Sequence, residues 1–177
     1  YDKVDRFIIV ESNRTHSCKE KPLYFKENES RYAKYMDKIT YLMWENNEPW
    51  TPDSWIQENA QRNYILEGLH DIDDAWVMIS DADEIPNKNM IDIAINSKAS
   101  DWYTFHQQMF FYNLKQKTLR NWTGSILTHV STLKEKTPQW FRNNRMWGVK
   151  IENGGWHLSY WGTPDAIQYK IESFAHQ

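Results

Sequence analysis

The chain is poor in cysteine, in basic excess and in long apolar runs. Cys18 is the one cysteine in 177 residues, which excludes an intrachain disulfide and any zinc site built from several thiolates. Lys and Arg number 21 against 24 Asp and Glu, for a formal net charge of -3. This balance argues against a nucleic acid partner, because duplex binding depends on clustered basic residues. Runs such as Phe7–Val10 are far too short to span a membrane, so we expect no membrane segment in this chain.

Aromatic residues, by contrast, are abundant, with 10 Trp, 10 Tyr and 7 Phe. Most of these rings are expected to fill the core of one compact domain over residues 1–177. The mean hydropathy is nevertheless -0.82, so the rings lie in polar sequence. Some of them are suited to line a wet cleft, because flat rings pack against the apolar faces of sugars and bases. The location in the cell stays open: cytosolic, or lumenal if an anchor lies outside this chain.

Strand and helix patterns alternate through the first half of the chain. Short β-branched or apolar runs predict strands, and capping residues followed by helical periodicity predict helices. The expected strands cover residues 6–11, 39–44, 75–80, 102–113, 124–132, 149–151 and 156–160. The expected helices cover residues 27–36, 54–69, 87–96 and 165–175, and residues 137–145 are expected to form a helix or a turn. This alternation favours an α/β fold with a mostly parallel central sheet.

Acidic residues directly follow the expected strand at residues 75–80. Asp81 and Asp83 stand two residues apart there, and alternate residues of an extended segment point to the same side. Ligands bind beyond the carboxyl ends of strands in open α/β sheets, and Mg²⁺ or Mn²⁺ prefers carboxylates together with substrate phosphates. The pair is therefore a candidate metal site. A second pair, Asp71 and Asp73, precedes the strand, and we expect it to be solvated structure.

The segment from Ser80 to Pro86, Ser-Asp-Ala-Asp-Glu-Ile-Pro, resembles the signature of glycosyltransferase family 17. Further stretches resemble this family in the same order along the chain: residues 4–13, 21–25, 122–124, 155–159 and 170–174. The best known members add the bisecting N-acetylglucosamine to N-glycans. Several motifs in register are much more specific than one Asp-x-Asp pair.

The resemblance implies a GT-A type, Rossmann-like fold that binds a nucleotide sugar. It also implies a UDP-sugar donor, UDP-N-acetylglucosamine, a glycan or glycoprotein acceptor, a divalent metal (Mn²⁺ or Mg²⁺) and inversion at the anomeric carbon. Family members usually carry another strand and helix before the position of Tyr1, and they usually continue past Gln177. We therefore expect a fragment or compact version that lacks an N-terminal strand and helix.

The resemblance also assigns the metal ligands. Asp83 is the first candidate, and Asp81 is expected to bind the metal directly or to act through the ribose. His157, in a Gly-Trp-His segment, would complete the metal shell or contact a phosphate, because imidazole is an acceptable ligand for Mn²⁺. A structural role is the alternative for this lone histidine, and His176 is its competitor.

The remaining binding residues are assigned to the nucleotide sugar. By resemblance, Glu11 and Ser12 contact the nucleotide at the end of the first expected strand. The alternative for Glu11 is a structural role at the sheet edge. Lys21, Arg145 and Lys170 are candidate partners of the diphosphate, with solvated surface lysine as the alternative for Lys21.

An inverting transfer needs a general base near the acceptor hydroxyl, and two carboxylates compete for this role. A cation beside Glu84 would lower the pKa of that carboxyl and make it a poorer base. Asp165 is therefore favoured, although its place at the start of an expected helix also suits an N-cap.

Two other function classes stay open. One is a glycan- or nucleotide-binding module without turnover, which would bind the donor but neither transfer nor hydrolyse it. The other is a metal-dependent phosphohydrolase using the same carboxylates, which would release inorganic phosphate.

Overall fold

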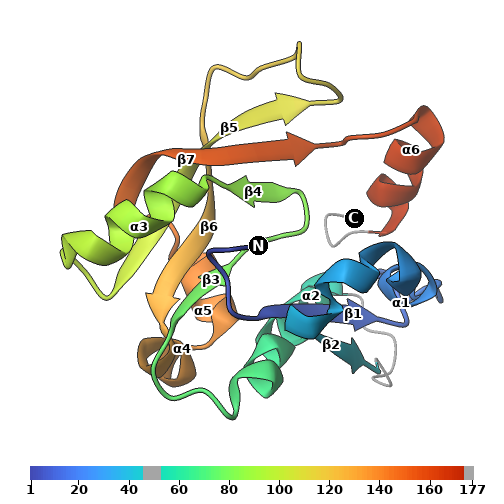
Figure 1. Cartoon of the computed structure of the whole chain (residues 1–177). Coiled ribbons are helices and arrows are strands. Elements are labelled where there is room, and N and C mark those ends of the chain that lie inside the picture. The colour runs from blue at the N-terminus through green and yellow to red at the C-terminus, as the bar shows by residue number, and fades with distance from the viewer. Residues whose placement is uncertain (46–52, 174–177) are drawn as a thin grey trace. The chain divides into compact units, whose positions relative to one another are not determined.

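The computed structural model describes residues 1–45 and 53–173 (Figure 1). The chain forms two compact units, one of Tyr1–Asp71 with Gln168–Gln177 and one of Ile72–Ile167. Each unit has its own sheet, and the expectation of a single domain over residues 1–177 stays a prediction.

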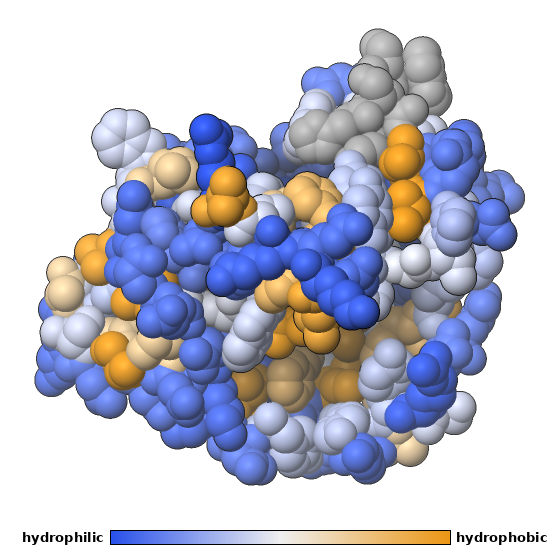
Figure 2. Space-filling model, turned by 90° about the horizontal axis from the view of Figure 1, so that it is seen from above, coloured by the Kyte–Doolittle hydropathy of each residue, from blue (hydrophilic) through white to orange (hydrophobic). Residues whose placement is uncertain are grey.

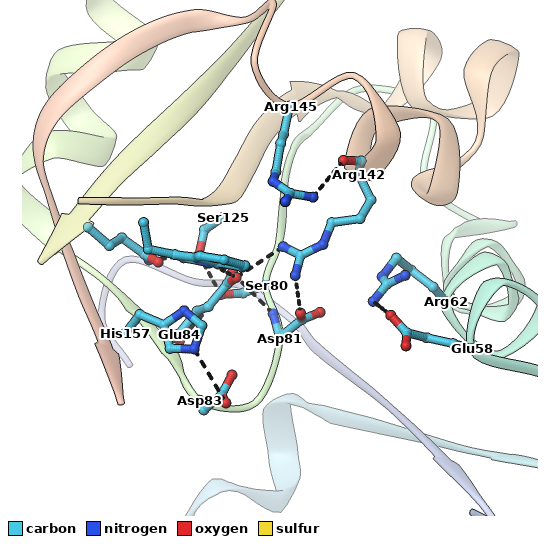
Figure 3. Close-up of polar contacts among 12 residues, drawn as sticks. Glu58, Arg62, Ser80, Asp81, Asp83, Glu84, Ser125, Arg142, Arg145 and His157 are labelled. Carbon is cyan, nitrogen blue, oxygen red and sulfur yellow. Dashed lines mark hydrogen bonds and ion pairs between the residues drawn. The ribbon is translucent and has the colours of Figure 1, made fainter. Parts of the chain in front are cut away.

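The first unit is built on a parallel pair of strands, β1 (Phe7–Ser12) and β2 (Ile39–Trp44). Both strands confirm the sequence prediction. Parallel neighbours need a crossover connection, and helical segments provide it here. On helix α2 (Ser54–Asn63), which comes after β2 in the chain, Arg62 donates to Glu58 at 2.8 Å, the i,i+4 pair drawn in Figure 3. The helical segments of this unit before the second unit begins are α1 (Tyr24–Glu27), η1 (Glu29–Lys38), α2 (Ser54–Asn63) and η2 (Tyr64–Leu69).

The second unit contains a five-stranded sheet in the order β3-β6-β5-β7-β4. Only β5 and β7 run parallel in it, while the other three neighbouring pairs are antiparallel. The larger sheet thus corrects the prediction of a mostly parallel sheet, and the chain is a mixed α/β structure. The antiparallel pairing of β5 with β6 follows from the connection between them. Residues 112–121 form a hairpin-like link that is too short for the helical crossover that parallel strands need. The strands are β3 (Trp76–Ile79), β4 (Glu84–Pro86), β5 (Trp102–Phe111), β6 (Trp122–His129) and β7 (Val149–Ser159).

The core of the second unit joins a helix to this sheet. Ala94, on α3 (Lys88–Ser97), is fully buried and packs in one cluster with Tyr103, Phe105 and Leu127. Burying one large apolar side chain contributes about 1.5–3 kcal/mol. Further buried apolar residues come from α4 (Val130–Lys136) and α5 (Pro138–Asn143). The sheet is thereby a rigid support for the loops at its strand ends.

Two features of the sheet were not expected from the sequence. Residues 149–159 form the single strand β7 instead of two short strands, with backbone φ values of +55° at Asn153 and +134° at Gly155. The three-residue strand β4 was not predicted at all. It pairs with β7 so that Glu84 stands opposite His157, and Pro86 opposite Gly155. This pairing brings two distant motifs of the sequence together.

Within the described residues, no helix is long and apolar enough to cross a membrane. On the face shown in Figure 2, hydrophobic residues are interspersed among hydrophilic ones.

Candidate functional site

The Asp-x-Asp motif lies on a turn that joins β3 to β4. The backbone N–H of Glu84 donates to the carbonyl of Asp81 at 3.0 Å, which closes the turn. The carbonyl of Asp83 accepts from the backbone N–H of Leu158 at 2.8 Å, which ties the turn to β7. The two aspartates are therefore held between β3 and β4 on a turn that is bound to β7.

Glu84 is the centre of the polar network behind this turn (Figure 3). Its side chain has 0% exposure. Oε1 accepts from Nε1 of Trp122 at 2.7 Å and from Nη1 of Arg142 at 3.1 Å. Oε2 accepts from Oγ of Ser125 at 3.0 Å and from the backbone N–H of Asp81 at 3.3 Å. A buried carboxylate whose oxygens are taken up by protein donors is suited to position its neighbours, and poorly suited to accept a proton from an acceptor hydroxyl.

Arg142 joins two of the acidic residues through one guanidinium group. Its Nη2 donates to Oδ2 of Asp81 at 2.6 Å, while Nη1 reaches Glu84. The guanidinium also lies 5.4 Å from the ring centroid of Trp122, and that of Arg145 lies 5.1 Å from the same ring. Arg142 was missed in the sequence because it comes 61 residues after Asp81 and belongs to no recognisable motif. Arg145, predicted as a phosphate contact, is brought to the same ring.

Asp83 faces His157 across the junction of β4 and β7. Oδ2 of Asp83 lies 3.5 Å from Nε2 of His157, with side-chain exposures of 28% and 8%. The imidazole is held edge-on to the ring of Trp122, at a centroid distance of 4.6 Å. Its Nδ1 is buried and has no hydrogen-bond partner in the part of the chain that the structure describes. Ring packing, rather than a hydrogen bond to Nδ1, therefore orients the imidazole toward Asp83.

The carboxylate of Asp83 and the imidazole of His157 are chemically compatible with a divalent cation. Ligand distances of about 2.1 Å place neighbouring oxygen ligands of Mg²⁺ roughly 3 Å apart, close to the 3.5 Å seen here. Among residues 1–45 and 53–173, no group of three or more His, Cys, Asp and Glu side chains could hold a metal ion. Two protein ligands suffice for an ion whose remaining ligands are water and phosphate oxygens.

In the first unit, Glu11 is surrounded by protein donors. Its carboxylate accepts from the backbone N–H groups of Phe25 at 3.0 Å and Lys26 at 3.4 Å, in the first turn of α1. The hydroxyl of Tyr41 donates to it at 3.0 Å, and Nζ of Lys21 lies 3.8 Å away. Burial, together with the bond to Glu11, raises the pKa of Tyr41 to about 12. These contacts match the structural alternative for Glu11, and they place the predicted phosphate contact Lys21 beside it.

The other predicted site residues lie as follows. Ser12 is buried, and its Oγ accepts from the backbone N–H of Arg14 at 3.2 Å. Asp165 and Lys170 are both on α6 (Pro164–Ser173). Asp165 is exposed in the first turn, where Oγ1 of Thr163 accepts from the backbone N–H of Ala166 at 3.3 Å. Thr163 thus provides a cap for this helix and leaves Asp165 available for another role.

One histidine named in the sequence analysis is not placed. His176 lies outside the described residues. The structure therefore brings together five predicted site residues in the second unit: Asp81, Asp83, Glu84, Arg145 and His157.

Comparison with known proteins shows the family of this chain. The sequence profile described as glycosyltransferase family 17 matches residues 1–177. The chain belongs to glycosyltransferase family 17. Its similarity to individual curated members is distant. The β-1,4-mannosyl-glycoprotein 4-β-N-acetylglucosaminyltransferases of Rattus norvegicus, Homo sapiens and Mus musculus are each 24% identical to it over 206 aligned residues.

These family 17 alignments cover 97% of this chain but 38% of each relative. The chain thus spans well under half the length of the curated relatives that it matches. No solved structure matches it. Family membership confirms the resemblance drawn from the Ser80–Pro86 motif, and the structure adds which family 17 side chains meet around that motif.

Proposed function

We propose that this family 17 chain carries the active site of an inverting glycosyltransferase with a GT-A type fold. It would move N-acetylglucosamine from UDP-N-acetylglucosamine to a hydroxyl of a glycan or glycoprotein acceptor. The observation that carries the proposal is the pairing of Asp83 with His157 on a turn supported from behind by the buried Glu84. The names of the relatives support the transferred sugar and the type of acceptor.

In this proposal, Asp83 and His157 hold Mn²⁺ or Mg²⁺. The bound ion would neutralise charge on the UDP leaving group. Asp83 is the better direct ligand of the two aspartates, because Oδ2 of Asp81 is already bound by Arg142. Asp81 would then act on the ribose side of the nucleotide.

Positive charge beside the turn supports the binding of a diphosphate. The guanidinium groups of Arg142 and Arg145 both lie over the ring of Trp122. Guanidinium groups bind phosphate through paired, charge-assisted hydrogen bonds. Arg142 binds two carboxylates, and Arg145 donates to the carbonyl of Arg142 at 3.2 Å. Of the two arginines beside the turn, we assign Arg145 to the diphosphate.

We assign the general base to Asp165 rather than Glu84. The carboxylate oxygens of Glu84 accept hydrogen bonds from Trp122, Arg142 and Ser125. Asp165 is exposed at the start of α6, so its oxygens can reach an acceptor from solvent. A base must come within hydrogen-bond reach of the proton it takes. Replacing Asp165 with Asn should therefore lower kcat while leaving the affinity for the donor unchanged.

Isothermal calorimetry with UDP-N-acetylglucosamine tests the donor site directly. Wild-type protein should bind the donor with Mn²⁺ present and should lose that binding in EDTA. Asp83→Ala should abolish the part of donor binding that depends on Mn²⁺. Asp73→Ala is the matched control, because it removes an aspartate with the same spacing and 96% side-chain exposure, and it should bind like wild type.

Two outcomes would overturn the assignment. Folded wild-type protein that binds neither UDP nor UDP-N-acetylglucosamine has no donor site of this kind. Equal binding in Mn²⁺ and EDTA would remove the metal role of Asp83 and His157. Donor binding without sugar transfer or hydrolysis would instead indicate a binding module, and release of inorganic phosphate would indicate a phosphohydrolase.

A further inference from the structure

A small polar pocket of about 190 Å³ lies in the second unit, away from the Asp-x-Asp turn. Its walls come from β5, β7, the residue that caps α3 and the residue that precedes β6. The side chains that matter below are His106, Gln108, Asn121 and Trp156. None of the candidate donor-site residues lines it.

This pocket opens on the face of the sheet opposite to the donor site. The amide of Gln107 donates to Ser125 at 3.0 Å, within the network of the Asp-x-Asp turn. On β5, His106 and Gln108 stand on either side of Gln107, and on β7 Trp156 directly precedes His157, which faces Asp83. Successive residues of a strand point to opposite faces. The pocket and the donor site are therefore separate sites on one sheet.

Three polar groups at this pocket are not used by the protein. Gln108 donates its amide nitrogen to two backbone carbonyls at 3.1 Å each, which leaves its Oε1 as an acceptor. Nδ1 of His106 lies 3.2 Å from Glu152, while its buried Nε2 has no hydrogen-bond partner among the described residues. Within the described part of the chain, the exposed side chain of Asn121 makes no hydrogen bond. An unpaired buried nitrogen costs about 1–3 kcal/mol.

The lining of the pocket has no formally charged Lys, Arg, Asp or Glu side chain among the described residues. Amides both donate and accept hydrogen bonds, as sugar hydroxyls do, and neutral amides give little attraction for a phosphate. Trp156 adds a flat ring that is 45% exposed, suited to pack on the apolar face of a sugar. At roughly 30 Å³ per water, a pocket of 190 Å³ has room for one sugar ring.

We propose that this pocket binds one neutral sugar unit, a hexose or an N-acetylhexosamine, on the face of the sheet opposite to the donor site. That this unit belongs to the acceptor glycan rests on the proposed function; the preference for a neutral sugar rests on the pocket alone. The pocket would hold the glycan at a point remote from the reacting hydroxyl.

The indole N–H signals of ¹⁵N-tryptophan-labelled protein provide the test. Trp156→Phe and Trp161→Phe assign the two signals, and Trp161 is a matched control because its exposure is 46%. Titration with free N-acetylglucosamine, mannose and galactose should move the Trp156 signal saturably for at least one sugar and leave the Trp161 signal in place. Asn121→Ala should weaken that affinity about three- to tenfold, as expected for one lost hydrogen bond. Inorganic phosphate should have no effect.

The proposal fails if no sugar moves the Trp156 signal, if Trp156 and Trp161 respond alike, or if phosphate alone acts. Its failure is distinguishable from that of the proposed function. Asp83→Ala should keep the sugar response of Trp156, and Trp156→Ala should keep metal-dependent binding of the donor. A sugar response in a protein that binds no UDP-N-acetylglucosamine would uphold the pocket and reject the transferase.

Discussion

Asp71 and Asp73 have the same spacing as Asp81 and Asp83, but the two pairs differ in what lies behind them. Asp71 is bound by both terminal nitrogens of Arg6, at 2.7 and 2.9 Å, and the side chain of Asp73 is 96% exposed. Asp81 and Asp83 have side-chain exposures of 34% and 28%. Asp81 and Asp83 directly precede the buried Glu84, which accepts from the backbone N–H of Asp81. The Asp-x-Asp spacing alone does not distinguish the two pairs. The Asp81/Asp83 pair is the candidate metal site because buried residues hold its turn in place.

The largest expected effect is a difference in kcat/KM between variants of the two Asp-x-Asp pairs. Asp83→Asn keeps the size of the side chain but weakens the metal ligand, and we expect kcat/KM to fall by at least about 100-fold, since even outer-shell changes cost 10–100-fold in metal sites. Asp73→Asn should stay within about twofold, because its carboxylate is solvated. Release of UDP in the presence of a glycan acceptor measures both. Equal losses in the two variants would show that the support behind the motif does not matter.

The next effect concerns the buried glutamate itself. Glu84→Gln places an amide NH₂ among the donors of Trp122, Arg142 and Ser125, so at least one donor loses its acceptor. The free energy of unfolding should fall by about 1–3 kcal/mol. Urea unfolding checks this, with the exposed Asp73→Asn expected within about 0.5 kcal/mol of wild type. An unchanged urea midpoint for Glu84→Gln would show that the hydrogen bonds to Glu84 do not stabilise the fold.

A smaller difference should separate the two Arg–Asp pairs. Arg142 binds two carboxylates from one guanidinium and is 16% exposed, whereas Arg6 is 34% exposed. Lysine cannot reproduce that fork, so Arg142→Lys should raise the Kd for UDP-N-acetylglucosamine about tenfold by releasing the turn, a change of about 1.4 kcal/mol. Arg6→Lys should leave the Kd unchanged. Isothermal calorimetry measures the Kd of both variants. An equal change in Kd for Arg142→Lys and Arg6→Lys would contradict a supporting role for Arg142.

The sequence was most informative where the signal is local. The β-branched run of β1, the position of β2 and the carboxylates directly after β3 were all predicted, because each depends on neighbouring residues. The strand β4 could not be predicted, since three residues ending in Pro86 gain their structure from pairing with β7. The direction of strand pairing also depends on distant partners, which explains why a mostly parallel sheet was expected.

For the candidate site, the sequence predicted the candidate ligands but not the residues that contact them. Asp81, Asp83 and His157 were expected because they stand in motifs. Arg142 was not, because its contacts with Asp81 and Glu84 span 61 and 58 residues of sequence. The burial of Glu84 was equally hidden, since the sequence left Glu84 as a competitor of Asp165 for the role of general base. Support of this kind depends on tertiary packing, whereas motifs are local.

The smallest expected effect concerns the pH dependence of the first pair. The hydrogen bonds from Arg6 lower the pKa of Asp71 from 3.8 to about 2. Because the folded pKa is below the unfolded one, the stabilisation is complete above about pH 4 and is lost as the pH falls toward about pH 2. The urea midpoints of wild type and Arg6→Gln should therefore differ by a constant amount between about pH 5 and pH 7, and should converge below about pH 3. The difference should be small and should shrink in salt, because both side chains are open to solvent. A gap that stays the same at low pH would mean that Arg6 stabilises the fold through its bond to the carbonyl of Gly68, and that the first Asp-x-Asp pair contributes nothing through its charge.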